Sequence, residues 1–595
     1  MPWLWLFLEL AVEQLAAWTV AVHVCMATGA PAAWAWPLWL ALAIALGALT
    51  RGRLSEARAA SSAERGFALG ALAIAGVASG LGLVLLTPSG DDFNFFHRAL
   101  WQLDHLGDPF ARGDTAFGVP GLPAISPLHV LTSWELGLAM SAEALGLDPL
   151  GVYHNGAVVL GNLLLVAVTA LWLREVGLGT RAALVGVVGS LAFLYADDPA
   201  VRSWAIAYRM LWVGKMVQWL VILPAALLFA WRYLQAPTPR KLLHPFLCGV
   251  GAVATSGTGV FLLPGVLAAA SLAGLLLRPL GLRWLCSCAA LNLGSLYCVG
   301  VAGALLVGWL PQPEDMRAWV DSFPGRWDEN LRLVIPHVPA LLRNGALAFL
   351  VPWVLLRGEA RVFLVAFGLV LLLVFLNPIA GPLWLDAVQP GSFWRLALLF
   401  PVPLAAGVVA GSLVASSVSG VRRWGVAAVT VLLIVGARLA DPPAAAFMQH
   451  RYSVKSPLAL RFAPGEVSLL HPFRADLAGR ELLAARGIST TAALLVPSVA
   501  IEASRLQDTR HVFSNAGVPE EGRRRIRAWE WASRCDWPGG LEAAAMASIE
   551  RGVGAVLVVD CGARDAVRRS SVLGHAGARF REVARENGYV LYLRR

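Results

Sequence analysis

The sequence predicts a mainly α-helical, polytopic membrane protein whose transmembrane bundle is followed by a C-terminal α/β domain. Hydrophobic residues occupy 57% of the 595 positions and charged residues 14%, and the mean hydropathy is +0.64. Apolar runs long enough to cross a bilayer recur along residues 1–440, whereas residues 441–595 are far more polar. This composition excludes a soluble globular protein for most of the chain, and the sequence holds no nucleic-acid-binding motif.

The predicted spans are apolar segments separated by loops. They lie at about 3–28, 32–50, 66–86, 150–173, 181–196, 214–231, 242–277, 284–310, 339–356, 360–378, 393–416 and 424–440. The run at 242–277 is too long for one ordinary span and is interrupted by Thr255-Ser256-Gly257-Thr258-Gly259. We expect two short helices or a re-entrant pair there, which makes about thirteen crossings in all. The first run carries Glu9 and Glu13 and lacks a basic leader, which favours a retained helix over a cleaved signal peptide.

Basic residues in the loops predict the orientation of these spans. They fall in alternate connections if the run at 242–277 crosses twice. The residues are Arg51, Arg53, Arg58, Arg65, Arg174, Arg181, Arg232, Arg240, Lys241, Arg278, Arg283, Arg357, Arg361, Arg422 and Arg423. Cytoplasmic loops are enriched in Lys and Arg, so we expect a cytoplasmic N-terminus. The remaining loops, which are 87–149, 197–213, 311–338 and 379–392, then converge on the extracytoplasmic side.

The segment 441–595 combines helix and strand signals. An Ala-rich pattern, LEAAAMASIERG, is typical of a helix, and the run from Ala555 to Asp560 is typical of a buried strand. A second strand-like run, residues 589–593, follows the turn signal Asn587-Gly588. We expect a small extracytoplasmic α/β domain. Cys535 and Cys561 could pair in that compartment, although the sequence alone does not decide it.

The first large outer loop, residues 87–149, places adjacent acids just beyond an apolar run. Asp91 and Asp92 stand near the membrane boundary and precede an aromatic stripe at helical spacing. One reading is that they only cap a surface helix. The other is that they also carry chemistry, because ionised side chains are costly next to hydrocarbon. A second surface helix is expected to begin at Ser126-Pro127.

Three stretches carry a family resemblance. DDFNFFHRALWQLDHLGDPF, VGKMVQWLVILP and FWRLALLFP, within this arrangement of spans and outer loops, resemble a bacterial branch of the GT-C superfamily of membrane glycosyltransferases. The resemblance implies transfer of a sugar from a polyprenyl-phosphate carrier to a glycan, lipid or protein acceptor, with inversion. It also implies a multi-pass protein of the bacterial inner membrane, surrounded by membrane lipids, that works on the extracytoplasmic face.

The chemistry of such a transfer fits residue types in the outer loops. A general base for the acceptor could be Asp91 or Asp92, and cations for the phosphate are available. The candidate substrate-binding residues are His97, Arg98, His105, Tyr208, Arg209, Lys215, Trp394 and Arg395. The plain alternative for the cations is interfacial snorkelling beside an aromatic belt. The segment 255–259 could line a site with its backbone, or could simply be a tight helical turn.

The residues leave metal use open. His97, His105, His129 and His154 show no tight ligand spacing such as HExxH, so we expect structural or proton-sharing histidines. Paired acids would suit Mg²⁺ or Mn²⁺, and GT-C enzymes include both metal-dependent and metal-independent members.

Two other functions stay open at this point. The first is a transporter or flippase for a lipid-linked saccharide, although such proteins usually show internal repeats, and none is evident here. The second is a non-catalytic protein of envelope assembly whose C-terminal domain binds a partner. Dispensable acids in the outer loops would favour either of these over a transferase.

Overall fold

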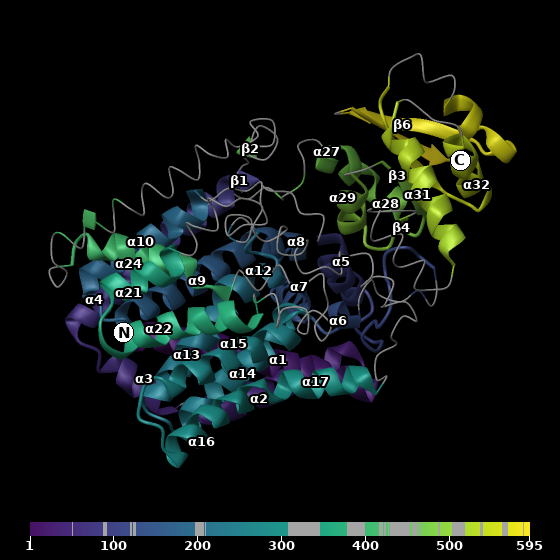
Figure 1. The fold of residues 1–595 in the computed structure, drawn as a ribbon. Coiled ribbons are helices and arrows are strands. Elements are labelled where there is room, and N and C mark those ends of the chain that lie inside the picture. The colour runs from purple at the N-terminus through teal and green to yellow at the C-terminus, as the bar shows by residue number, and fades with distance from the viewer. Residues whose placement is uncertain are drawn as a thin grey trace.

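The fold was analysed in a computed structural model of the whole chain. The structure describes residues 1–49, 51–86, 92–119, 122, 127–196, 208, 210–307, 346–375, 377, 399–415, 421, 424–425, 428, 453–454, 460, 462, 466–485, 488–501, 518–535, 540–561, 569–586 and 588–595. The predicted fold class is confirmed, since the chain forms a large helical bundle and a small C-terminal sheet (Figure 1). The predicted domain boundary at 440 lies outside the described residues.

The described part of the bundle follows the predicted apolar segments, whereas the predicted span at 424–440 lies almost wholly outside the described residues. Its described helices are α1 (Pro2–Thr28), α2 (Ala35–Leu49), α3 (Arg51–Arg58), α4 (Ser62–Val84), α8 (Pro149–Gly151), η2 (Val152–Gly156), α9 (Ala157–Glu175), α10 (Thr180–Ala196), α12 (Gly214–Val217), η3 (Gln218–Ile222), α13 (Leu223–Gln235), α14 (Pro239–Thr255), α15 (Gly259–Leu275), α16 (Leu282–Leu291), η4 (Asn292–Ser295), α17 (Leu296–Leu306), η5 (Ala346–Leu350), α21 (Val351–Leu355), α22 (Gly358–Val370), η6 (Leu371–Phe375) and α24 (Val402–Ser412). Five continuous helical segments in the described part are long and apolar enough to cross a membrane, and they are Pro2–Thr28, Ser62–Val84, Pro149–Glu175, Gly214–Gln235 and Leu282–Ala304. With the shorter apolar helices, they make the chain a multi-pass membrane protein.

The long run at 242–277 is divided as predicted. α14 ends at Thr255 and α15 begins at Gly259, with a short non-helical link between them. The link is tightly packed, because a Cβ at Gly257 would lie 2.3 Å from Leu128 Cβ and one at Gly259 would lie 2.2 Å from the Ala252 carbonyl oxygen. Only glycine allows this approach, which explains the two glycines of the interruption.

Three helices of the first outer loop cover one end of the bundle. They are α5 (Asp92–Leu103), α6 (Pro127–Val130) and α7 (Trp134–Ala144). The second surface helix begins at Pro127, as expected, but it stops after one turn. The chain then turns so that the Ser133 amide can donate to the Ala254 carbonyl at the end of α14, and α7 continues from Trp134.

The C-terminal region is a five-stranded mixed sheet with helices. Its strands are β3 (Glu481–Ala484), β4 (Ala500–Ile501), β5 (Ala555–Val559), β6 (Phe580–Glu586) and β7 (Tyr589–Arg594), in the order β4-β3-β5-β7-β6. β3 is parallel to β4 and β5, whereas β7 is antiparallel to β5 and β6. The helices include α27 (Glu466–Leu470), α29 (Ile488–Leu495), α31 (Pro519–Ser533) and α32 (Leu541–Glu550). Both predicted strands and the Ala-rich helix are confirmed, and Cys535 and Cys561 form a disulfide.

The C-terminal region docks on the first outer loop. His97 of α5 bonds to the Pro497 carbonyl through Nε2 (3.2 Å) and to Thr115 Oγ1 through Nδ1 (3.1 Å). The Ile501 amide of β4 donates to the Ala116 carbonyl (2.8 Å), which adds the loop to the edge of the sheet. We call this contact, made by His97, Thr115, Ala116, Pro497 and Ile501, the docking joint. Figure 1 shows the C-terminal region beside α5, at the far side of the bundle from the N-terminus.

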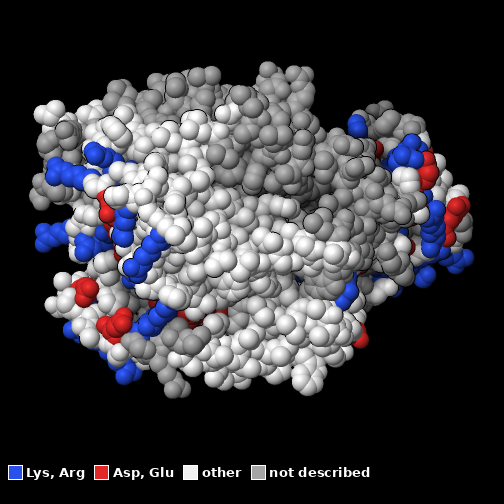
Figure 2. Space-filling view, turned by 60° about the horizontal axis from the view of Figure 1, so that its bottom comes forward, with Lys and Arg blue, Asp and Glu red and all other residues white. Residues whose placement is uncertain are grey.

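Charged side chains gather at the two ends of the molecule. Figure 2 shows Lys, Arg, Asp and Glu at the C-terminal region and at the opposite end, with a broad band of other residues between them. Such a band fits the hydrocarbon layer of a bilayer. We use "outer end" for the end that carries α5 to α7 and "inner end" for the end that carries α3.

Candidate functional site

Arg98 anchors α5 to the rest of the outer end. Its guanidinium donates from Nη1 to the Val130 carbonyl and from Nη2 to the Thr132 carbonyl, both at 2.7 Å. Burial lowers the pKa of Arg98 to about 10, and the nearby Glu135 carboxylate opposes that shift. The group therefore keeps its charge at neutral pH while it fixes α5 against the connection between α6 and α7.

The first turn of α7 is the meeting point of several helices. The Ser133 carbonyl accepts from Trp18 Nε1 of α1 (3.0 Å), and Ser133 Oγ bonds to Thr19 Oγ1 (3.0 Å). The buried Glu135 accepts at Oε1 from the Gly214 amide (2.9 Å), at the start of α12. A carboxylate that accepts from the first amides of a helix is favoured by the helix dipole.

Gly214 and Lys215 are brought to this turn by close packing. A Cβ at Gly214 would lie 2.5 Å from the Thr255 carbonyl oxygen and 2.9 Å from Glu135 Oε1, so the position requires glycine. Lys215 follows it directly and is half-buried. The predicted phosphate-binding lysine therefore lies one residue from the amide that Glu135 binds.

A hydrogen-bonded pair extends the polar network into the bundle. Thr258 Oγ1, in the link between α14 and α15, donates to Gln218 Oε1 (3.1 Å), and Gln218 Nε2 donates to the Ala252 carbonyl (3.4 Å). Gln218 also begins η3, a π-helical turn, and such turns are frequent at functional sites. We call Arg98, Glu135, Lys215, Gln218 and Thr258 the outer polar junction. It includes Thr258 of the segment 255–259 through its side chain, and a site lined by the backbone of this segment stays a prediction.

Sequence reasoning missed Glu135 and Gln218. Each is an isolated polar residue inside an apolar helical run, in the stretches LTSWELGLAM and GKMVQWL. Both are buried, at 2% and 0% exposure. A lone buried polar side chain needs a partner, and that requirement was the available signal.

The other predicted site residues are dispersed. His97 belongs to the docking joint, and burial lowers its pKa to about 4. The His105 ring stacks on the Trp101 ring, with 3.7 Å between their centres, and His105 Nδ1 is hydrogen-bonded to the Trp101 carbonyl near the end of α5. Tyr208 is buried, which raises its pKa to about 12. The substrate-binding roles of these three residues stay predictions.

The remaining candidates fall outside the part of the chain that the structure describes. Asp91, Arg209, Trp394 and Arg395 are not described, and Asp92 is described only as the first residue of α5, without its side chain. Their catalytic and binding roles therefore also stay predictions. Among the described residues, no cluster of three His, Cys, Asp or Glu side chains could hold a metal ion.

An apolar groove lies beside the outer polar junction. It has a volume of about 640 Å³, and it is lined by α1, α2, α7, α9 and the α12–η3 segment, with Trp18, Trp36, Trp39 and Trp134 among the lining residues. On α1 it extends from Phe7 to Trp18, or about 16 Å at the rise of an α-helix. The junction and the groove share α7 and α12. On α7, Trp134 lines the groove and the next residue, Glu135, belongs to the junction. On α12, Val217 lines the groove and Lys215 belongs to the junction.

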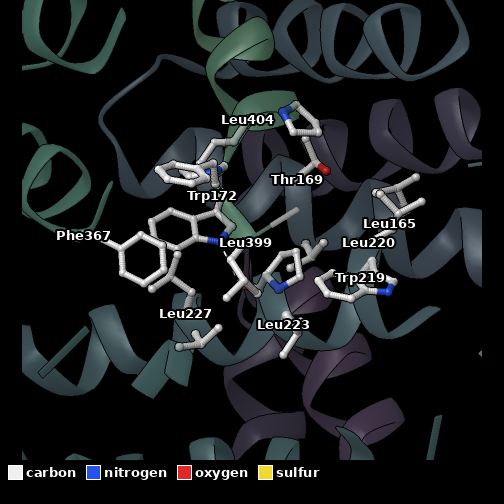
Figure 3. A pocket seen from close by; sticks show the side chains of 16 residues that line it. Leu165, Thr169, Trp172, Trp219, Leu220, Leu223, Leu227, Phe367, Leu399 and Leu404 are labelled. Carbon is white, nitrogen blue, oxygen red and sulfur yellow. Dashed lines mark hydrogen bonds between the residues drawn. The ribbon is translucent and has the colours of Figure 1, made fainter. Parts of the chain in front are cut away.

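A second cavity is unsuited to chemistry. It has a volume of about 70 Å³ and lies between α9, α13, α15, α22 and the start of α24. Figure 3 shows Trp172, Trp219, Phe367 and several leucines around it, with Thr169 at its edge. None of the described residues that line this cavity is charged, and Trp172 Nε1 donates to the Pro224 carbonyl (3.0 Å).

No protein-family model matches the chain, and no curated protein matches it. Among solved structures, the fold is similar to that of the arabinofuranosyltransferase AftD from Mycobacteria, with a TM-score of 0.49 and 14% sequence identity. The alignment covers 88% of this chain and 41% of that chain, so this chain spans less than half of that neighbour's length.

Proposed function

We propose that the protein is a membrane glycosyltransferase that takes a sugar from a polyprenyl-phosphate carrier and transfers it to a glycan, lipid or protein acceptor on the extracytoplasmic face. The observation that carries the proposal is the adjacency of a charged polar junction and a long apolar groove at the outer end of the bundle. A lipid-linked sugar needs both, since its phosphate requires cations and its tail requires an apolar channel.

The groove suits the first isoprene units of such a carrier. Its lining is overwhelmingly apolar, and its tryptophans offer broad, rigid surfaces to a branched hydrocarbon chain. It runs along α1 from the level of the junction toward the inner end. A phosphate held at Lys215 would leave the tail in position to enter it.

The charges of the junction divide into two roles. Arg98 donates to two backbone carbonyls, so it positions α5, the helix that begins at Asp92. Lys215, together with Arg209, Arg395 and the neighbouring Trp394, is assigned to the donor phosphate. Asp91 or Asp92 is assigned to the acceptor hydroxyl. In the transfer, the acceptor oxygen bonds to the anomeric carbon with inversion, its proton passes to the carboxylate, and the carrier phosphate leaves with the electrons of the broken bond.

Binding of the carrier alone tests the site. The purified full chain in detergent should bind undecaprenyl phosphate, measured by thermal shift, more tightly than undecaprenol, which lacks the phosphate. Ser141→Trp, which places a large ring in the groove, should weaken that binding about tenfold or more, whereas Ser141→Ala should not. Equal affinity for both lipids would show that the site does not recognise the phosphate. Unchanged binding of undecaprenyl phosphate in Ser141→Trp would show that the carrier does not bind in the groove.

The placement of this site outside the cytoplasm has its own test. Alternate basic loops predict that reporter fusions after Ser416 and after Arg595 report opposite sides of the membrane. A cytoplasmic signal from both fusions would contradict the extracytoplasmic C-terminal domain and the shared compartment that the transfer requires.

A further inference from the structure

The inner end of the bundle holds a charged cavity that the proposed sugar transfer does not use. It has a volume of about 380 Å³ and lies between the N-terminal part of α1, α3, the end of α13 and the start of α14. The charged and polar residues around it are Met1 with its amino group, Glu9, Arg53, Glu56, Glu64 at the start of α4, Arg232, Thr238, Arg240, Lys241 and His244. We propose that this cavity binds the phosphate of an anionic phospholipid headgroup.

The acids in the floor of the cavity are already compensated. Arg53 Nη1 lies 2.8 Å from Glu9 Oε2 and 3.0 Å from Glu13 Oε1, and all three side chains are buried. Arg232 Nη1 lies 3.8 Å from Glu9 Oε1, and its guanidinium lies 3.9 Å from the centre of the Trp5 ring. Two arginines thus offset these two carboxylates. Glu56 and Glu64 also line the cavity, and the Met1 amino group lies 3.8 Å from Glu64 Oε1, so an anion would be held by the excess of basic over acidic groups in the lining.

A buried donor faces the cavity from α14. His244 is 4% exposed and lines the cavity, and its Nε2 makes no hydrogen bond with a described residue. Its nearest charged neighbour is Glu13 Oε1 at 3.4 Å. His244 therefore adds a polar ring to the cavity wall, with its Nε2 against the Glu13 carboxylate.

Further positive charge lies at the rim. α14 begins at Pro239, and Arg240 and Lys241 occupy its first turn beside the capping residue Thr238, which also lines the cavity. Neither basic side chain forms an ion pair with a described carboxylate, and Lys241 Nζ donates to the Arg232 carbonyl (3.4 Å). The N-terminus of a seventeen-residue helix adds its own positive potential.

The walls and the position favour a lipid as the source of the phosphate. Trp5, Leu6 and Phe229 give the cavity an apolar side, as the glycerol and acyl regions of a phospholipid require. Figure 2 shows basic side chains concentrated at this end of the molecule. Basic pockets between transmembrane helices on the cytoplasmic side are suited to anionic headgroups, which are enriched in that leaflet.

The test compares rim and non-rim charges in the full chain. The purified protein in detergent is titrated with dioleoylphosphatidylglycerol, dioleoylphosphatidylcholine or inorganic phosphate, and the apparent affinity is taken from the rise in melting temperature. Arg240→Gln/Lys241→Gln should weaken the response to phosphatidylglycerol about tenfold or more, because two charge-assisted contacts are lost. The matched control is Arg181→Gln/Arg283→Gln, which removes two first-turn cations of α10 and α16 that do not line the cavity.

Each outcome decides the matter. A preference for phosphatidylglycerol that the rim variant loses and the control variant keeps supports the site. Equal stabilisation by phosphatidylcholine, or equal loss in both variants, would overturn it as a specific anionic site. If inorganic phosphate raised the melting temperature as much as phosphatidylglycerol does, the cavity would be a site for a soluble phosphate compound, and the proposal of a lipid ligand would be wrong. None of these readouts depends on sugar transfer.

Discussion

The two ends of the bundle bury charge in opposite ways. At the inner end, Glu9, Glu13, Arg53 and Arg232 face one another, so the charges compensate within the cluster. At the outer end, Arg98 binds two carbonyls and Glu135 binds a backbone amide. There the hydrogen-bond partners are dipoles of the main chain, which orient each charge, and the opposite charges of Arg98 and Glu135 also attract each other.

This difference bears on what each end can do. A compensated cluster stabilises helix packing when it is complete and costs much when one member is lost. Charges that backbone dipoles hold in a fixed orientation can, in a site that excludes water, act on the charges of a substrate or a transition state. The comparison is consistent with the two proposals, which place sugar transfer at the outer end and binding of an anionic headgroup at the inner end.

The largest expected effect is at the acidic pair that precedes the outer junction. Asp91→Asn or Asp92→Asn should lower sugar transfer at least about a hundredfold, because an amide cannot accept the acceptor's proton. Asn retains helix-capping ability, so the melting temperature should stay close to that of the unchanged protein. The assay is transfer from a lipid-linked donor in proteoliposomes. Full activity in both variants would leave capping as the role of the pair and favour the transporter.

The next effect concerns stability at the inner end. Arg53→Met leaves Glu9 and Glu13 buried without their closest cation, which should destabilise the protein by roughly 3–5 kcal/mol. Thermal unfolding in detergent measures this as a large fall in melting temperature. The double variant Arg53→Met/Glu13→Gln should recover part of the loss, because it removes one of the stranded carboxylates. An unchanged melting temperature in Arg53→Met would show that the cluster is not the compensated unit described above.

A smaller effect is expected for the cations assigned to the donor. Lys215→Ala and Arg395→Ala should each raise the apparent Michaelis constant for the lipid donor about ten- to a hundredfold, the equivalent of a lost charge-assisted contact of about 1.5–3 kcal/mol. Arg283→Ala, at the start of α16 and away from the outer junction, serves as the control. If neither Lys215→Ala nor Arg395→Ala changes the constant, the donor phosphate binds elsewhere.

How much the sequence could predict differs between local and long-range features. Apolar length predicted the helices, and the glycines of the segment 255–259 predicted the interruption between α14 and α15, because both depend on neighbouring residues. The roles of Arg98 and Glu135 depend on partners 34 and 79 positions away in the chain. In the sequence, no local pattern indicates that Arg53 of α3 lies against Glu9 and Glu13 of α1, so this cluster could not be predicted.

The smallest expected effect is a pH response of the docking joint, which holds the C-terminal region against α5. Burial lowers the pKa of His97 to about 4, so its contribution to docking is present above its ordinary pKa of about 6.5 and is lost as the pH falls toward 4. Asp114, which accepts from the Ala116 and Phe117 amides, behaves oppositely. Burial raises its pKa to about 6, against the hydrogen bonds and the Arg525 charge, so its contribution is present at low pH and is lost as the pH rises through 6.

The two responses oppose each other between pH 4 and 6, so the joint of the unchanged protein should vary little in stability over that range. Asp114→Asn should leave a joint that loosens as the pH falls below 6.5, and His97→Gln should leave one that loosens as the pH rises toward 6. Each unit of pKa shift corresponds to about 1.4 kcal/mol at most. Hydrogen exchange of the Ile501 amide, which donates to the Ala116 carbonyl, measures the opening directly. The same slope with pH in both variants would contradict this balance. It would mean that groups other than His97 and Asp114 determine how the stability of the docking joint depends on pH.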